Sequence, residues 1–207
     1  FHYQPIFDLR SQRIVSVESL VRWNQQGQWI SPGRFIPLAE ELRLIERIDT
    51  LGLRRALEWL KAHSRLPLEV SLNLSAQTLR DPALPQYVAS LLKEYGLSAQ
   101  QLIFEITETA LLKDLKSAQQ VLGELRQLGA KIALDDFGSG YASVAYLRHL
   151  PIDRLKLDRT LVINIGTGQA GEQLLRAMIQ LGHTLGMEVL AEGVETLEQM
   201  DWLSQNG

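Results

Sequence analysis

In its second half the chain reads Lys131-Ile132-Ala133-Leu134-Asp135-Asp136-Phe137-Gly138. An apolar run of this length that ends in acids and a glycine is typical of a buried strand followed by a loop. Similar runs of apolar and β-branched residues occupy 1–7, 14–23, 69–74, 102–107, 154–157 and 188–191. With 131–135, these runs predict seven strands.

Segments with helical periodicity separate these strands. Apolar residues recur every three or four positions in 47–63, 85–95, 118–128 and 172–185, and Gly96, Gly129 and Gly186 are placed to end three of these segments. Strands that alternate with helices predict the α/β class and a largely parallel sheet. No linker or low-complexity tract interrupts the alternation, so we expect one domain, residues 1–207. A barrel of this kind usually has eight strands, and only a helix follows the last predicted strand, so we expect the final βα unit to be absent.

Composition excludes several classes of protein. The chain has no cysteine, which rules out disulfides, thiolate zinc sites and cysteine nucleophiles and is compatible with the cytoplasm. A net charge of -3 with interspersed charges lacks the basic footprint that duplex nucleic acid requires. No apolar run approaches the roughly 18 residues of a membrane span, so we expect no membrane contact by this domain itself. The abrupt start in strand-like residues suggests a module of a longer chain.

Polar side chains lie at the carboxyl ends of nearly all the predicted strands. In chain order they are Glu18, Asn73, Glu105 with Glu108, Asp135 with Asp136, Lys156, and Glu192. A single acid of this kind is more often a solvated carboxylate or an ion-pair partner. In a barrel, however, these strand ends meet at one mouth, where four or five like charges would repel strongly without a cation. The pattern therefore predicts a metal site.

The predicted ligands decide which metal fits. Carboxylates and one amide oxygen favour Mg²⁺ or Mn²⁺ over zinc or copper, and the histidines lie at a terminus or on helix-like segments, where a structural role is expected. So many acids are compatible with two ions that share a bridging carboxylate, an arrangement suited to phosphoryl chemistry. Lys156 could hold or help deprotonate an attacking water, or it could form a salt bridge to a neighbouring acid. We favour the first role because lysine is uncommon in a core strand.

Eight segments of this chain resemble, in order, the sequence motifs of the EAL-domain cyclic di-GMP phosphodiesterases. They are Tyr3-Gln4-Pro5-Ile6, Val17-Glu18-Ser19-Leu20-Val21-Arg22-Trp23, Phe35-Ile36-Pro37-Leu38-Ala39-Glu40, Asn73-Leu74-Ser75, Glu105-Ile106-Thr107-Glu108, Asp135-Asp136-Phe137-Gly138, Lys156-Leu157-Asp158-Arg159 and Ala191-Glu192-Gly193-Val194-Glu195-Thr196. The resemblance implies a TIM-like β/α barrel with an antiparallel first strand. It also implies hydrolysis of one phosphodiester of cyclic di-GMP, which gives linear pGpG.

The resemblance further implies roles for single residues. Two divalent ions, Mg²⁺ or Mn²⁺, serve the family's reaction: Glu18, Asn73, Glu105 and Asp135 match the ligands of the first, and Asp135, Asp136 and Glu192 match those of the second. Lys156 resembles the lysine that contacts the catalytic water, and Glu108 the glutamate that steadies the glycine-rich loop after Asp136. Gln4, Leu20 and Arg22 resemble substrate contacts, with Arg22 at a phosphate and Leu20 beside a guanine. For Leu20, a place in the core is the alternative.

The same resemblance implies a homodimer, and it is compatible with sensor or diguanylate cyclase domains fused outside this chain. Two features depart from the family's pattern. Glu18-Ser19-Leu20 replaces Glu-Ala-Leu, a change that leaves the ligand in place, and the family's final strand with Gln-Gly-Tyr has no counterpart in these residues.

Two alternative functions stay open. One is a receptor that binds cyclic di-GMP without cleaving it, although such a receptor is expected to lose ligand carboxylates that this chain retains. The other is an unrelated metal-dependent barrel enzyme, such as a lyase or an isomerase, against which the order of the eight segments argues.

Overall fold

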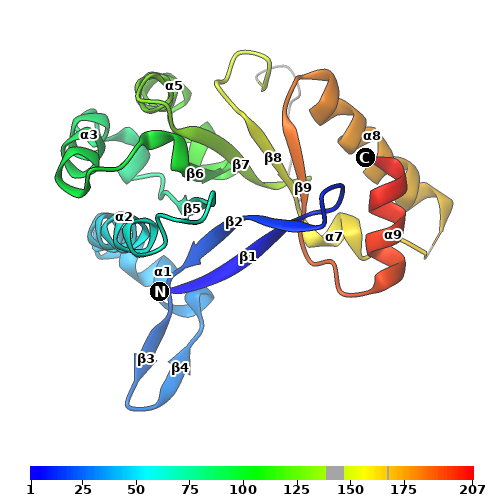
Figure 1. Ribbon diagram of the computed structural model, residues 1–207, viewed down its shortest axis with the longest axis horizontal. Coiled ribbons are helices and arrows are strands. Elements are labelled where there is room, and N and C mark those ends of the chain that lie inside the picture. Colours follow the sequence, from blue (N-terminus) through cyan, green and yellow to red (C-terminus); the bar gives the residue numbers. More distant parts are fainter. Residues whose placement is uncertain (139–146, 167) are drawn as a thin grey trace.

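A seven-stranded sheet forms the centre of the computed structural model, which describes residues 1–138, 147–166 and 168–207 (Figure 1). Its strands are β1 (His2–Asp8), β2 (Arg13–Leu20), β5 (Glu69–Asn73), β6 (Leu102–Thr107), β7 (Lys131–Phe137), β8 (Arg154–Leu157) and β9 (Glu188–Ala191). They are hydrogen-bonded in this order. The strands β1 and β2 are antiparallel, and each later pair of neighbours is parallel.

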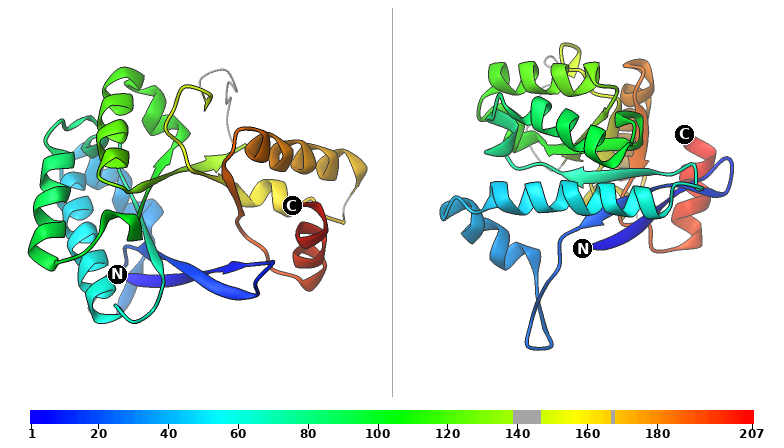
Figure 2. Two further views of the ribbon diagram at one scale, coloured as in Figure 1. Left: turned by 45° about the horizontal axis from the view of Figure 1, so that its top comes forward. Right: turned by 60° about the vertical axis from the view of Figure 1, so that its left-hand side comes forward.

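The sheet curls so that its strands surround a common centre and the helices lie outside (Figure 2). This is the predicted α/β fold, a TIM-like β/α barrel with an antiparallel first strand. Within the described ranges no ladder joins β9 to β1, so the barrel is open at this seam. Across the seam, Arg10 Nη2 donates a hydrogen bond of 3.1 Å to the Gly207 carbonyl, which links the β1–β2 turn to the far end of the chain.

Helices pack around the sheet, most of them on its outer face (Figure 2). They are α1 (Pro32–Glu41), α2 (Ile45–Ala62), α3 (Leu84–Tyr95), α4 (Glu108–Leu112), α5 (Leu115–Gln127), α7 (Arg159–Val162), α8 (Gln169–Thr184) and α9 (Leu197–Asn206). Their apolar faces pack on outward-facing strand residues such as Leu72, Phe104 and Leu134, which are almost completely buried. None of the helices in the described ranges combines the length and apolar character of a membrane span.

The predicted strands agree closely with those observed, with one correction. The run 14–23 does not form a single strand, because β2 ends at Leu20 and the chain leaves the sheet at Val21 and Arg22. The residues that follow form a separate hairpin of β3 (Trp23–Gln25) and β4 (Gln28–Ile30), which projects from the body in Figure 1. Residues 23–25 pair with 28–30 instead of extending β2, across a tight turn in which Gln26 and Gly27 both have positive φ and the Gly27 N–H donates to Asn24 Oδ1 at 3.0 Å.

Candidate functional site

The register of the parallel ladders brings polar residues from distant segments together. Asn73 on β5 lies opposite Glu105 on β6, and Glu105 lies opposite Ala133 on β7, two residues before Asp135. Opposed residues share a face of the sheet, and side chains alternate along each strand. Asn73, Glu105 and Asp135 therefore lie on the inner face of the barrel, at the carboxyl ends of their strands.

Lys156 lies at the centre of this group. Its Nζ is 2.6 Å from Glu105 Oε2, 2.8 Å from Glu192 Oε1, 3.1 Å from Asp135 Oδ1 and 3.4 Å from Glu18 Oε2. The Lys156 side chain is only 1% exposed and that of Glu105 is 0% exposed, so this ammonium and this carboxylate meet away from water. We call Lys156 with these four acids the lysine cluster. Six predicted residues are thus connected, because Asn73 Nδ2 also donates to Glu18 Oε1 at 3.2 Å.

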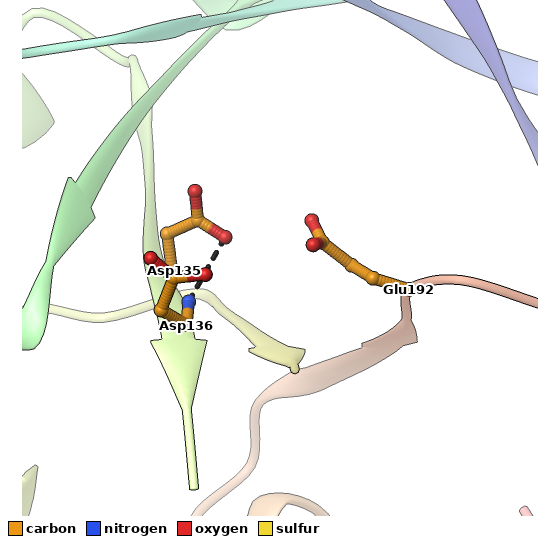
Figure 3. A group of neighbouring side chains, drawn as sticks. All are labelled: Asp135, Asp136 and Glu192. Atoms are coloured by element: carbon orange, nitrogen blue, oxygen red, sulfur yellow. Dashed lines mark hydrogen bonds between the residues drawn. The ribbon is translucent and has the colours of Figure 1, made fainter. Parts of the chain in front are cut away.

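A bulge in β7 brings two consecutive aspartates to the same site. Neighbouring side chains on a regular strand point to opposite faces, but the β7–β8 register shifts between Leu134 and Phe137, and Asp136 has a φ of 57°. Bulges of this kind redirect side chains, and aspartate tolerates the left-handed conformation. Figure 3 shows Asp135 and Asp136 at the end of β7, with Glu192 reaching toward them from the end of β9. The Asp136 N–H donates to Asp135 Oδ1 at 3.0 Å.

The crowding of charges changes the acidity of the cluster. Burial, opposed by Lys156 and reinforced by the negative charges of Glu18 and Asp135, raises the pKa of Glu105 to about 8. Burial alone would lower the pKa of Lys156, but the surrounding carboxylates outweigh it and raise that pKa above its usual value. Burial also raises the pKa of Asp136 and of Glu192. The lysine therefore keeps its proton, whereas Glu105 is shifted toward its protonated form near neutral pH.

The same residues fit a divalent cation. Four carboxyl groups surround one ammonium, so the cluster carries three excess negative charges when all four are ionised, before Asp136 is counted. Glu105 Oε1 is buried and has no hydrogen-bond partner among the described residues. Ligand oxygens of Asp135, Asp136 and Glu192 lie within 4.8 Å of one another. Hard oxygen donors that converge on one point are the ligands that Mg²⁺ and Mn²⁺ prefer.

A cavity of about 560 Å³ opens beside the lysine cluster. Glu18, Asn73 and Asp135 border it on the side of the cluster, and Leu20 and Arg22 line its wall. Apolar residues of α1 and α2 form much of the remaining surface, including Ile36, Ile45 and Ile48. The arrangement offers an apolar wall for a flat group and a guanidinium for an anion, next to a site suited to metal ions.

The predicted site residues Gln4 and Glu108 are not among those that line the cavity. Gln4 pairs with Glu18 in the β1–β2 ladder, but it is exposed and is not among the residues that line the cavity. Glu108 is the first residue of α4 and is buried, and its Oε2 has no partner among the described residues. Most of the glycine-rich loop that it is expected to steady, residues 139–146, lies outside the described residues.

The cavity also has a buried acid that the sequence analysis did not single out. The Oδ2 atom of Asp49 on α2 accepts hydrogen bonds from the Ser75 N–H at 2.9 Å and from Thr78 Oγ1 at 2.6 Å, so it holds the turn that follows Asn73. Burial raises the pKa of Asp49, although these hydrogen bonds oppose the shift. A signal was present in the sequence, since Asp49 lies on the apolar face of α2 together with Ile45 and Leu53.

Comparison with known proteins shows which family the chain matches. A family model described as the EAL domain matches residues 1–207. The chain is 39% identical over 211 residues to the cyclic di-GMP phosphodiesterase NbdA of Pseudomonas aeruginosa, which covers 99% of this chain and 27% of that protein. It is 36% identical over 211 residues to the probable cyclic di-GMP phosphodiesterase PdeB of Escherichia coli, covering 100% of this chain and 40% of that protein. The chain therefore spans less than half the length of these relatives.

Solved structures agree with this assignment. A structure described as the PaMucR phosphodiesterase in complex with c-di-GMP superimposes with a TM-score of 0.92 at 33% identity, covering 100% of this chain and 85% of that chain. The EAL domain of FimX from Pseudomonas aeruginosa, bound to c-di-GMP, superimposes with a TM-score of 0.92 at 27% identity, covering 99% of this chain and 84% of that chain.

Proposed function

The chain belongs to the EAL domain family, and on this premise we propose that it hydrolyses cyclic di-GMP to linear pGpG with the help of divalent metal ions. The observation that carries the proposal is the lysine cluster beside a cavity lined by Leu20 and Arg22. The relatives NbdA and PdeB are named as cyclic di-GMP phosphodiesterases, which supports the same substrate and reaction.

In this proposal the acids and Asn73 hold two ions, either Mg²⁺ or Mn²⁺. Glu18, Asn73, Glu105 and Asp135 would hold the first, and Asp135, Asp136 and Glu192 the second. Bound ions of this kind lower the pKa of a coordinated water and stabilise the negative charge that develops on a phosphodiester. The excess negative charge of the cluster and the unpartnered Glu105 oxygen support this ligand set.

The protein's own residues position the other reactants. Arg22 neutralises a phosphate of the substrate, and Leu20 packs against a guanine in the apolar part of the cavity. Lys156 keeps its proton, so it orients the attacking water through that water's oxygen. Attack of this oxygen on phosphorus breaks the bond from phosphorus to the 3′ oxygen. The attacking water releases one proton to solvent and the leaving 3′ oxygen takes up one from solvent, so one water molecule is added across the broken bond. The product is a linear dinucleotide with a 5′ phosphate.

Turnover of cyclic di-GMP by the purified chain tests this proposal. We expect linear pGpG to form with Mg²⁺ or Mn²⁺ and its formation to stop when a chelator is added in excess, as followed by chromatography of the nucleotides. Failure to form product with either metal would contradict the proposed reaction.

Binding without hydrolysis is the second candidate function. It is favoured by the similarity to the FimX domain, which is described as bound to c-di-GMP. Calorimetric binding of cyclic di-GMP with no product over hours would support a receptor, whereas metal-dependent product supports the enzyme. A homodimer and fused partner domains remain predictions from the resemblance, and a cytoplasmic location remains a prediction from the absence of cysteine.

A further inference from the structure

Lys156 contacts the same side chains that are proposed to hold metal ions. Glu18, Glu105, Asp135 and Glu192 each place a carboxylate oxygen within 3.4 Å of its Nζ. These are four of the six proposed ligand residues. An ammonium and a divalent cation both draw on these negative charges, and each repels the other at such short range.

The burial of this lysine shows how strongly the fold depends on the balance of charge. A buried ammonium is costly unless it is paired and hydrogen-bonded, and Lys156 is 1% exposed. The converse holds for its partners, because the acids would repel one another inside the barrel without a cation. A positive charge on β8 therefore keeps the carboxyl ends of β2, β6, β7 and β9 together around it.

We infer that Lys156 is an internal counter-ion that competes with divalent cations for the carboxylates of the lysine cluster, which weakens metal binding and keeps the site folded when metal is scarce. This inference rests on the metal site in the proposed function. It assigns Lys156 a role in metal affinity and stability that is separate from any contact with the attacking water.

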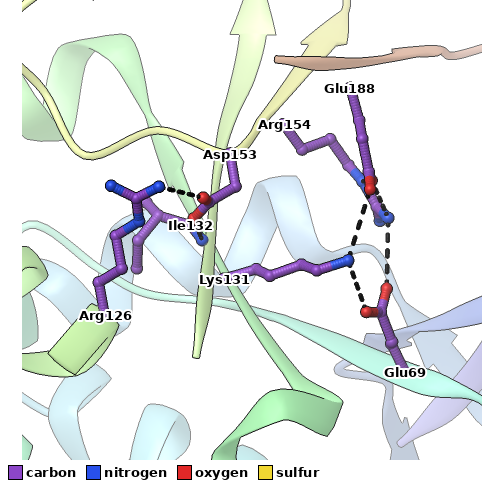
Figure 4. A network of polar contacts seen from close by, with 7 residues as sticks. All are labelled: Glu69, Arg126, Lys131, Ile132, Asp153, Arg154 and Glu188. Atoms are coloured by element: carbon purple, nitrogen blue, oxygen red, sulfur yellow. Dashed lines mark hydrogen bonds and ion pairs between the residues drawn. The ribbon is translucent and has the colours of Figure 1, made fainter. Parts of the chain in front are cut away.

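A second lysine provides a matched control. Lys131 also lies between two acids inside the barrel, with Nζ 2.7 Å from Glu69 Oε1 and 3.4 Å from Glu188 Oε1. Figure 4 shows this network, which includes Arg154 and lies at the amino-terminal ends of the strands. Lys131 contacts none of the proposed metal ligands among the described residues.

The test compares the wild type with Lys156→Met and Lys131→Met by calorimetric titration of Mn²⁺ and by thermal unfolding with and without a chelator. We expect Lys156→Met to bind Mn²⁺ about tenfold more tightly or better, because the competing charge is gone. In chelator, the melting temperature of Lys156→Met should be lower than that of the wild type. The rise in melting temperature on adding Mn²⁺ should be larger for Lys156→Met than for the wild type. Lys131→Met should melt at a lower temperature under both conditions, with a Mn²⁺ affinity close to that of the wild type.

Lys156→Gln is the second neutral variant and can still donate hydrogen bonds to the acids. If neither neutral variant folds even with saturating Mn²⁺, the inference is overturned, because a metal ion should replace the lost charge. Equal Mn²⁺ affinity in the wild type and Lys156→Met would overturn this inference alone. The absence of Mn²⁺ binding in all variants would overturn the proposed metal site as well, and wild-type turnover measured in parallel separates the two failures.

Discussion

Asp135 is the residue from which both proposed ions draw a ligand. It contacts Lys156 at 3.1 Å, receives the Asp136 N–H, and shares a group of close ligand atoms with Asp136 and Glu192. An amide in its place keeps nearly the same size but carries no negative charge, so a substitution here tests charge with little change in packing.

We predict that Asp135→Asn lowers cyclic di-GMP turnover by about a hundredfold or more, since it removes charge that stabilises the bound ions. Product formation at saturating Mn²⁺ measures this effect. Asp114→Asn is the control, because Asp114 caps α5 through the Ser117 N–H and lies outside the site. Equal turnover in Asp135→Asn and the control would remove Asp135 from the proposed ligands.

Asp49 gives a prediction about stability and pH. Asp49→Ala leaves the Ser75 N–H and the Thr78 hydroxyl without their acceptor, and it should lower the free energy of unfolding by about 1–3 kcal/mol. Asp49→Asn retains an acceptor and removes a buried charge, so at pH 7 it should be at least as stable as the wild type. Urea unfolding of the three proteins measures these differences.

The sign of the pH dependence follows from the raised pKa of Asp49. The folded chain holds this proton at pH values at which the unfolded chain has already lost it. The stabilising contribution is fully present below the unfolded pKa of about 4 and is lost as the pH rises through the higher folded pKa. The advantage of Asp49→Asn over the wild type should therefore grow across this window. A constant difference would contradict the burial of the charged group.

At the scale of single elements, glycine has different roles at the end of a helix and inside one. Gly96 follows α3 with a φ of 70°, a conformation that costs little only for glycine, and a Cβ added there would meet no atom within 4 Å. Gly123 lies inside α5, also with open space around an added Cβ. An added Cβ meets no steric contact at either position, so the two substitutions differ mainly in the backbone strain that the positive φ of Gly96 causes.

We predict opposite effects of alanine at these two glycines. Gly96→Ala should lower the free energy of unfolding by about 1 kcal/mol because it forces a left-handed alanine. Gly123→Ala should raise it by about 0.5–1 kcal/mol because alanine is the better helix former. Thermal or urea unfolding measures both, and a loss of stability in Gly123→Ala would contradict the open space around a Cβ at that position.

How far the sequence predicts the elements depends on their environment. The strands at 102–107, 154–157 and 188–191 have the predicted bounds, because each is a short segment rich in apolar residues between two helical segments. Helix α1 was not predicted, since Pro37 within it reads as a helix breaker. The polar residues at strand ends could be predicted from barrel geometry, but the contacts of Lys156 and the role of Asp49 needed the register and the packing of α2.

At the scale of the whole molecule, charged residues form two layers inside the barrel. The lysine cluster lies at the carboxyl ends of the strands. At the amino-terminal ends, Arg154 Nη2 contacts Glu188 Oε2 at 2.8 Å and Glu69 Oε2 at 3.4 Å, which joins β5, β8 and β9 across the interior (Figure 4). The two layers differ in charge. The layer at the amino-terminal ends is closely balanced, because Lys131 and Arg154 face Glu69 and Glu188, whereas the lysine cluster has an excess of acidic groups.

Substitutions in the layer at the amino-terminal ends of the strands should therefore change the stability of the fold without changing the rate of the reaction. The Arg154 side chain is only 6% exposed. Arg154→Met keeps an unbranched side chain of similar length but removes its charge, so Lys131 is the remaining partner of Glu69 and Glu188 in this network. Because the Arg154 guanidinium is buried while the Glu69 and Glu188 side chains are 22% and 56% exposed, we predict a loss of about 1–3 kcal/mol in the free energy of unfolding. Arg126→Met is the control: Arg126 pairs with Asp153 at 2.9 Å but is 53% exposed, and its loss should cost about 1 kcal/mol or less.

Turnover per folded molecule distinguishes the two layers. Arg154→Met should retain the wild-type Mn²⁺ affinity and cyclic di-GMP turnover at temperatures well below its lowered unfolding transition, because within the described ranges the Arg154 guanidinium pairs with Glu69 and Glu188 and not with the lysine cluster. Chemical denaturation followed by activity measurements on the same samples provides both values. A fall in turnover that is larger than the fall in folded fraction would mean that the two layers are coupled through the strands, and it would contradict the separation of fold and reaction between the two ends of the barrel.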